Sequence, residues 1–392
     1  MRQRQFTITR QDVHRHVTHR LHTYLRRPGY GRRCSAGMLL AALLAAAARL
    51  TSLFAAARRL LGLPSGETIR QALLAALPGR AELERRLNRA LAADLPGCLA
   101  RAAQPLAIDL TPRPYHGRYH TDPAEVYRGK AKGGTSHFHA YATAYVTCHG
   151  RRFTLALTWV TRGEPLEEVV RRLLLRVGRI GIRVRYLLLD RGFSTVGVIR
   201  SLQAARRPFL MPLPLRGRKA DHPKGASGSR VFAYHKRSGW SHYTLTDAHK
   251  RRATVGVCVK CRNRRGERGR HGRQALVYAY GGGLKPASYQ WVKETYRSRF
   301  AIETTYRQLG QARIRTSTRD PLLRLLYVAL ALILRNVWVW LHWQVLAERR
   351  RGGRRVDTDR LPFRAMLLGL QHWAEALLGV RDDVQAKYPV CN

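Results

Sequence analysis

The pattern of apolar and polar positions along the chain changes near Pro105. From Ser35 to Leu99 the chain is rich in alanine, leucine and arginine, a composition that favours helices. Residues 64–69 interrupt this stretch, and Ser65 is a suitable N-cap for a helix that begins near Glu67. Two helices joined by a short turn fit either a helix-turn-helix motif or a plain helical bundle, and the sequence leaves both open.

Beyond Pro105 short apolar runs alternate with amphipathic stretches. Short runs rich in β-branched and aromatic residues predict strands, and longer runs with helical periodicity predict helices. The order strand, hairpin, helix, strand, helix, strand indicates a mixed α/β fold with one crossover into a buried parallel strand. The expected strands are 106–109, 138–147, 152–160, 186–190 and 208–211, and the expected helices are 164–178 and 194–205.

Residues 214–288 break that alternation. They are rich in arginine, lysine, glycine and serine, and their short alternating runs predict an antiparallel insertion. The basic loop 262–273 within it fits either a clamp on the DNA backbone or a solvated loop. The alternating runs are 240–245, 253–260 and 276–280, and helical patterns return at 288–311 and 321–346.

Charge narrows the class of partner. The 392 residues include 72 lysines and arginines against 24 acids, a formal net charge of +48. This excess indicates a polyanionic partner, and because the basic residues are spread along the whole chain, nucleic acid is favoured over a membrane surface. The apolar stretch 325–346 contains Arg335, Asn336 and His342, so a buried helix explains it better than a membrane span, and no membrane partner is expected.

The six cysteines are scattered and do not resemble a secreted disulfide scaffold, so a reducing cytoplasm is the expected location. Cys258 and Cys261 form half of a zinc motif, but no second CxxC pair accompanies them.

Three carboxylates stand in positions that suggest a metal site. Asp109 and Asp190 each close an apolar run, and Glu303 lies on a helical pattern. An acid that ends a buried strand is costly unless something neutralises it, and a divalent metal is the usual answer. Three acids from separate elements can converge on a two-metal site. His137 and His139 fit either an approach to such metals or ordinary strand positions.

Plainer readings of the same residues stay open. At about 100° per residue, Tyr296, Arg299, Glu303 and Arg307 share one helix face, and an ordinary ion-pair face would look the same. Asp109 fits a strand-end cap as well as a ligand. The residues after Asp190 fit a simple turn.

Two segments carry a resemblance to a known family. Asp190-Arg191-Gly192-Phe193 and the stretch from Tyr296 to Arg307 resemble the signature blocks of insertion-sequence DDE transposases. The spacing of Tyr296, Arg299 and Glu303 matches the YREK signature of one large group, and Asp109 fits the family's first acid. The signature lysine is replaced by Gly310, on a helix face where Arg307 could supply the charge but not the geometry.

The resemblance implies an RNase H-like mixed sheet flanked by helices, with a β-rich insertion and an N-terminal helical domain. It implies that Asp109, Asp190 and Glu303 are catalytic and hold two Mg²⁺ or Mn²⁺ ions. The enzyme would hydrolyse a phosphodiester at each transposon end and join the freed 3′-hydroxyl to target DNA. The expected DNA-contacting residues are Tyr296, Arg299, Arg307, Arg191 and Trp240, with Trp291 as the alternative to Trp240 for stacking a flipped base.

The partners expected on this reading are double-stranded DNA, both transposon ends and target, and a second copy of the chain in a homodimer. Two alternatives stay open: a catalytically inactive DNA-binding protein derived from a transposase, and an RNase H-like nuclease without strand transfer. The expected segments are a basic N-terminal arm or small helical unit (1–34), a helical DNA-binding domain (35–100), the first part of the core (101–213), the insertion (214–288), the last part of the core (289–347) and a C-terminal helical tail (348–392).

Overall fold

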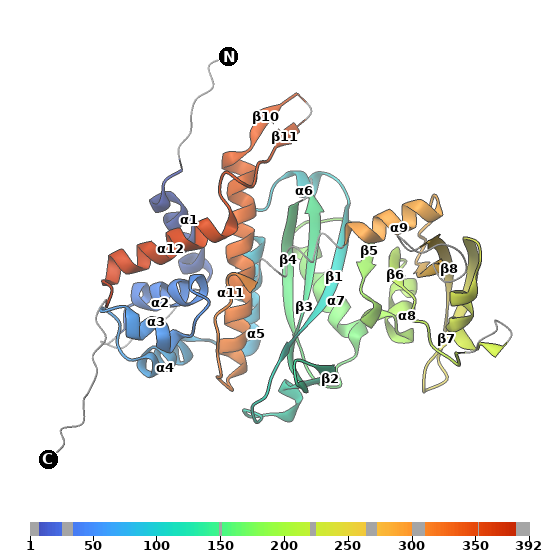
Figure 1. Cartoon of the computed structure of the whole chain (residues 1–392), viewed down its shortest axis with the longest axis horizontal. Coiled ribbons are helices and arrows are strands. Elements are labelled where there is room, and N and C mark those ends of the chain that lie inside the picture. Colours follow the sequence, from blue (N-terminus) through green and yellow to red (C-terminus); the bar gives the residue numbers. More distant parts are fainter. Residues whose placement is uncertain are drawn as a thin grey trace. The chain divides into compact units, whose positions relative to one another are not determined.

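The computed structural model describes residues 8–25, 34–148, 151–219, 225–263, 273–299, 310–351 and 353–381. The chain divides into two compact units (Figure 1). The first consists of Met1–Asp94 together with Thr305–Asn392, and the second of Leu95–Thr304. The boundary at Thr304 falls inside the segment 289–347, which the sequence predicts to be one part of the core.

A mixed sheet forms the second unit, and nine strands of it lie within the described residues. β1 (Gln104–Pro114) runs antiparallel to β3 (Thr135–Cys148) and parallel to β5 (Val184–Leu189). β5 is also parallel to β6 (Phe209–Pro212). β4 (Arg151–Val160) and β2 (Tyr127–Lys132) both pair with β3. The expected strands and the mixed α/β class are confirmed, whereas β2 was not anticipated.

The insertion lengthens this same sheet. β9 (Arg273–Gly281) pairs antiparallel with β6, followed by β8 (Arg252–Asn263) and β7 (Gly239–Thr246). A 3₁₀ helix, η4 (Gly228–Tyr234), precedes β7. The three predicted runs are therefore strands, and their backbone hydrogen bonds continue the ladder of the core.

Helices flank the sheet of the second unit. α7 (Leu166–Arg179) is amphipathic and packs on β3 and β4, where Arg172 Nε donates to Thr158 Oγ1 at 2.9 Å. α8 (Val196–Ala204) begins at its N-cap Thr195 and packs beside α7. The remaining described helices are α6 (Cys98–Arg101), α9 (Tyr289–Ser298), and the 3₁₀ turns η1 (Pro123–Glu125) and η2 (Arg191–Phe193).

The described part of the first unit is mainly helical. Ser65 caps α4 by accepting from the Thr68 N–H, as the sequence predicts, and the segment that the sequence left open as arm or helix forms α1. The helices are α1 (Arg10–Tyr24), α2 (Ala36–Ala48), α3 (Leu53–Arg59), α4 (Gly66–Ala76), α5 (Arg80–Ala92), α11 (Pro321–Trp340), the π-helix η5 (Leu341–Leu346) and α12 (Phe363–Leu378).

The helix Pro321–Leu346 is long and apolar enough to cross a membrane, yet 83% of its most apolar window is buried inside the protein. The bent pair α2 and α3 passes the same composition test when its two helices are taken together. Arg335 and Asn336 of α11 are themselves buried, and Asn336 Nδ2 donates to Leu91 O at 3.0 Å. Packing against α4, α5 and α12 accounts for the apolar composition of α11.

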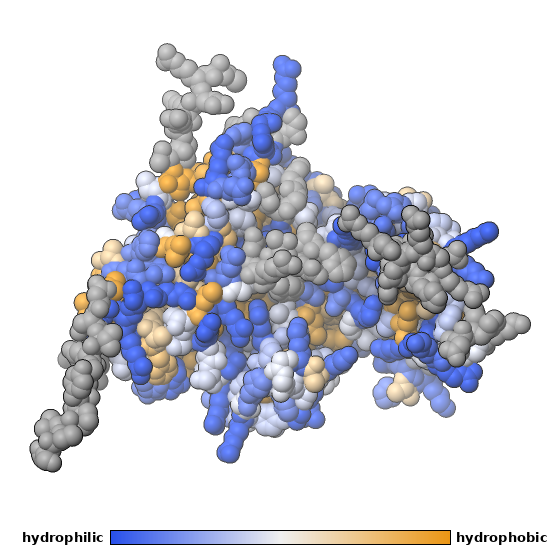
Figure 2. Space-filling view, in the orientation of Figure 1, coloured by the Kyte–Doolittle hydropathy of each residue, from blue (hydrophilic) through white to orange (hydrophobic). Residues whose placement is uncertain are grey.

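A short hairpin follows η5, in the segment for which the sequence indicates a helical tail. It consists of β10 (Glu348–Arg350) and β11 (Gly353–Arg355), and α12 comes after it. The space-filling view shows a mainly hydrophilic face over the described residues (Figure 2).

Candidate active site

The first two predicted acids lie at neighbouring strand ends. β1 and β5 are parallel, with Ile108 opposite Leu189, so the residues that follow, Asp109 and Asp190, lie at the same level of the sheet. Asp109 is a buried residue within β1, only 7% exposed. Asp190 directly follows β5, and its side chain is 41% exposed. The parallel register thus brings together two carboxylates that are far apart in the sequence.

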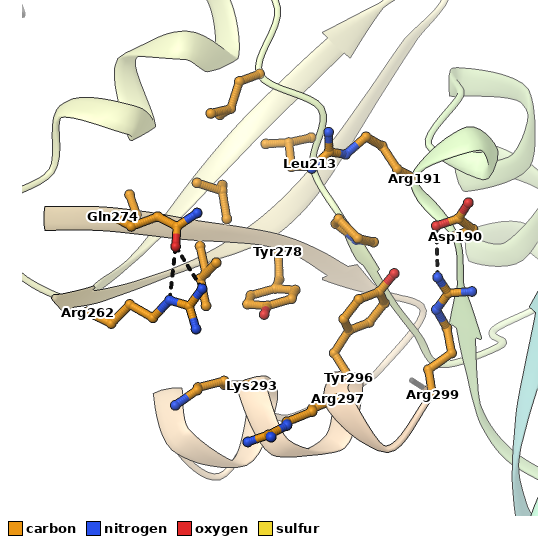
Figure 3. Close-up of a pocket in the computed structure, with 15 residues that line it drawn as sticks. Asp190, Arg191, Leu213, Arg262, Gln274, Tyr278, Lys293, Tyr296, Arg297 and Arg299 are labelled. Carbon is orange, nitrogen blue, oxygen red and sulfur yellow. Dashed lines mark hydrogen bonds and ion pairs between the residues drawn. The ribbon is translucent and has the colours of Figure 1, made fainter. Parts of the chain in front are cut away.

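Arg299 lies between these two acids. It is the C-cap of α9, and its backbone N–H donates to Tyr296 O at 3.1 Å. Its guanidinium bridges the pair: Nη1 lies 3.5 Å from Asp109 Oδ1, and Nη2 donates to Asp190 Oδ1 at 2.9 Å (Figure 3). Because Arg299 is only 7% exposed, its charge is neutralised inside the protein by both carboxylates.

The electrostatics of Arg299 follow from this geometry. Burial acts to lower the pKa of Arg299, but Tyr296, Tyr145 and the two aspartates outweigh it and hold the pKa above its ordinary value. Burial also raises the pKa of Tyr296, so its phenol keeps its proton at neutral pH and can donate a hydrogen bond. The Arg299 guanidinium lies 5.3 Å from the centre of the Tyr296 ring.

A pocket of about 730 Å³ opens beside the acids, between α9 and the strands of the insertion (Figure 3). Among the described residues that line it, Asp190 is the only acid. Tyr278 and Tyr296 stand in its wall with ring centres 5.3 Å apart. Arg262 donates to Gln274 Oε1 across β8 and β9, at 2.7 Å from Nη2. The cationic residues that line the pocket are Arg191, Arg262, Lys293, Arg297 and Arg299.

The remaining predicted site residues have different outcomes. Glu303 and Arg307 lie outside the described residues. Arg191 lines the pocket, as do Tyr296 and Arg299. Trp240 of β7 does not line it: the side chain is 42% exposed and stacks on Tyr289, with ring centres 4.7 Å apart.

Trp291 and the two histidines take part in other contacts. Trp291 packs edge-on against Tyr186 at 5.9 Å. His139 is buried edge-on against Tyr115, with ring centres 4.7 Å apart, and lies opposite Arg113 in the β1–β3 ladder. This is an ordinary strand position, one of the two alternatives that the sequence left open. His137 lies 6.5 Å from the Tyr119 ring.

The two cysteines of the half zinc motif are engaged separately. Cys258 is buried in β8, and burial raises the pKa of its thiol to about 12. Cys261 Sγ donates to His235 O at 3.2 Å. Within the described residues no three histidine, cysteine or acidic side chains cluster closely enough to hold a metal ion.

The donors around Asp109 nevertheless fit a divalent cation. Asp109 and Asp190 supply the oxygen ligands that Mg²⁺ prefers, and the guanidinium between them marks a position that favours positive charge. Thr143 lies opposite Asp109 in the β1–β3 ladder, and its Oγ1 is buried with no hydrogen-bond partner among the described residues. An unpaired hydroxyl on the same sheet face as a buried carboxylate is a suitable neighbour for an ion or its water.

Sequence reasoning missed several lining residues. Lys293 and Arg297 lie one helical turn apart on α9, so the helix phase could have included them with Tyr296. The Arg262–Gln274 pair and the position of Thr143 opposite Asp109 depend on strand register, which no local pattern gives.

Comparisons with known proteins agree with this architecture. The family model described as "Transposase DDE domain" matches residues 101–337. No curated protein matches the chain. A solved structure, the cryo-EM structure of a piggyBac transposase synaptic complex with hairpin DNA, is similar in fold with a TM-score of 0.50. The two sequences are 12% identical, and the match covers 94% of this chain and 77% of that one. The mixed sheet flanked by helices is thus similar in fold to a transposase structure, and the chain belongs to the DDE transposase domain family.

Proposed function

We propose that the protein is a cut-and-paste DNA transposase that uses Asp109, Asp190 and Glu303 to hydrolyse phosphodiesters at transposon ends and to join those ends to target DNA. The observation that supports this most is the placement of Asp109 and Asp190 at adjacent parallel strand ends, bridged by Arg299 beside a cationic pocket. Two Mg²⁺ ions, or Mn²⁺, held by these carboxylates would supply activation of the attacking oxygen and stabilisation of the leaving oxygen.

The chain's own groups would position the DNA strand. The neutral phenol of Tyr296 donates a hydrogen bond to a phosphate oxygen. The guanidinium of Arg299 moves away from the two aspartates and contacts the same phosphate. Arg191, Lys293 and Arg297 hold the neighbouring backbone along the pocket. Arg307 adds a further phosphate contact, in place of the lysine that Gly310 replaces.

Other parts of the chain take supporting roles in this proposal. The exposed Trp240 ring, backed by Tyr289, offers a face on which an unpaired base stacks. The helical residues 35–100 bind duplex DNA near each end. Two copies of the chain hold the two ends together as a homodimer, and the protein acts in the cytoplasm.

The test is an assay in which labelled end DNA, Mg²⁺ and a target duplex are incubated with the purified protein. Wild type should give cut ends and joined products, and Asp190→Asn should give neither while still binding DNA. Asp122→Asn is the matched control, because Asp122 is exposed and an asparagine oxygen can still accept from the Ala124 N–H.

Two outcomes would replace the proposal. Cutting without joining would indicate a nuclease, and binding without cutting would indicate a DNA-binding protein. Cleavage that survives in Asp190→Asn would remove this carboxylate from the chemistry.

A further inference from the structure

The hairpin β10–β11 has two faces with different surroundings. Its register pairs Glu348 with Arg355, Arg349 with Arg354, and Arg350 with Gly353. Because strand side chains alternate, Arg350 and Arg355 share one face with Glu348, and Arg354 belongs to the other. The hairpin arginines are Arg349, Arg350, Arg351, Arg354 and Arg355.

The face of Arg354 fixes the hairpin to the preceding helix. Arg354 Nη1 donates to Trp343 O at 2.6 Å and to Gln344 Oε1 at 2.9 Å. Its guanidinium also lies 5.7 Å from the centre of the Trp343 ring. Arg360 closes the base of the hairpin through an ion pair with Glu348. These contacts hold the short ribbon at the end of η5, so its other face has a defined position.

The face of Arg350 and Arg355 carries unneutralised charge. Arg350, Arg351 and Arg355 are exposed, and Arg351 and Arg355 have no ion pair with any described residue. Glu348 lies 3.5 Å from Arg350 but is shared with Arg360. Figure 1 shows the hairpin standing off the end of α11, and Figure 2 shows it as hydrophilic. Three arginines therefore point outward with one shared acid among them.

We infer that β10–β11 is a second DNA-binding element, whose outward arginines neutralise backbone phosphates of a duplex away from the acids that cut. A two-stranded ribbon fits the major groove of B-DNA, and the arginine fork matches phosphate oxygens. The inference rests on the proposed function only in taking DNA as the partner. It adds a contact that the DDE residues do not supply.

Binding of a random-sequence DNA duplex across a salt series tests this. The triple variant Arg350→Ala, Arg351→Ala, Arg355→Ala leaves the anchor Arg354 in place. Each lost phosphate contact lowers the slope of log affinity against log salt by about 0.9, so the slope should fall by two to three, with a loss of affinity of about tenfold or more near 0.1 M salt. The matched control is Arg89→Ala, Arg179→Ala, Arg200→Ala, which removes the same charge from exposed positions on other helices.

Two comparisons can overturn the inference. An equal loss in the control would mean that only total charge matters. A triple variant with lysine at the three hairpin positions should restore the slope, and failure to restore it would contradict a backbone contact. Thermal unfolding of each variant checks that the protein is folded.

The outcome is separable from that of the proposed function. Asp190→Asn should bind with the wild-type slope, and the hairpin alanine variant should still cut DNA at saturating protein. If wild type never cuts but its slope depends on the hairpin, the inference stands without the proposed function. If cutting is normal and the slope is unchanged, the hairpin has no such role.

Discussion

The acidic site and the β10–β11 hairpin use arginine in opposite ways. Arg299 is buried and bridges two carboxylates, whereas Arg350, Arg351 and Arg355 are exposed around one shared acid. A buried charge without a partner costs several kcal/mol, so burial requires pairing. An exposed charge costs little and remains available to a polyanion. In our proposals, this difference separates an arginine of the reaction centre from arginines that attract DNA.

The largest expected effect is at Asp109. Asp109→Asn removes one buried partner of Arg299 and one predicted cation ligand, so cleavage should fall by on the order of 10²–10³-fold or more, while DNA affinity should stay within a few-fold of wild type. Single-turnover cleavage rates measure the first quantity, and filter binding measures the second. A parallel fall in both would mean that Asp109 serves folding rather than cutting.

Arg299→Gln tests the buried half of the comparison. Without the guanidinium, the two carboxylates repel each other, and the free energy of unfolding should fall by about 2–3 kcal/mol, discounted because Asp190 is half exposed. Millimolar Mg²⁺ should recover most of this loss by replacing the lost charge. Urea denaturation with and without Mg²⁺ measures it, and a loss that Mg²⁺ leaves unchanged would contradict the assigned role.

The helical unit contains another interacting group of charged and titratable side chains. Arg20 donates to Asp94 at 2.7 Å, and His16 stacks on Trp340 with ring centres 4.0 Å apart. Burial, together with the charges of Arg20 and His19, lowers the pKa of His16 to about 4, although Asp94 partly opposes this shift. Between about pH 4 and pH 6.5 the His16 imidazole therefore binds a proton in the unfolded chain but not in the folded chain. This contribution to stability is complete above pH 6.5 and is lost as the pH falls from 6.5 toward 4, by about 2 kcal/mol after a discount for the partial exposure of the His16 side chain.

Denaturation midpoints across that pH window measure this effect. His16→Gln should flatten the dependence, since glutamine does not titrate. An unchanged slope in the variant would assign the titration to another group, such as His14, whose pKa burial also lowers.

The smallest effect is expected in the pocket. Replacing Lys293 and Arg297 by alanine should weaken binding of a DNA end by about three- to tenfold and reduce the salt slope by one to two. The same change should slow cleavage more than the hairpin variant does, because these cations line the same pocket as Asp190. Equal cleavage rates for the two variants at saturating protein would remove that distinction.

The sequence was sufficient to predict most strands of the core and the positions of two of the three acids. Apolar runs located the strands, and the rule that parallel strands end at one edge accounts for the meeting of Asp109 and Asp190. The position of Arg299 between them could not be predicted, because it depends on how α9 approaches the sheet. Glu303 lies outside the described residues, so its expected place with the other acids stays a prediction.

The hairpin was missed for a different reason. Residues 348–355 contain too few apolar positions for a strand period to register, and a run of arginines around two glycines is typical of a solvated loop. The contacts of Arg354 and Arg360 with neighbouring groups give it a defined position. The alternation of apolar and polar residues predicts buried strands well. A strand that is held by polar contacts does not produce this alternation, so the sequence does not reveal it.

A titration of the DNA-free protein with Mn²⁺, followed by electron paramagnetic resonance, tests directly whether Asp109 and Asp190 share a cation. We expect saturable Mn²⁺ binding by wild type, a loss of at least tenfold in affinity for Asp109→Asn and for Asp190→Asn, and no loss for Asp122→Asn. Binding that is the same in all four proteins would contradict a cation shared by the two carboxylates.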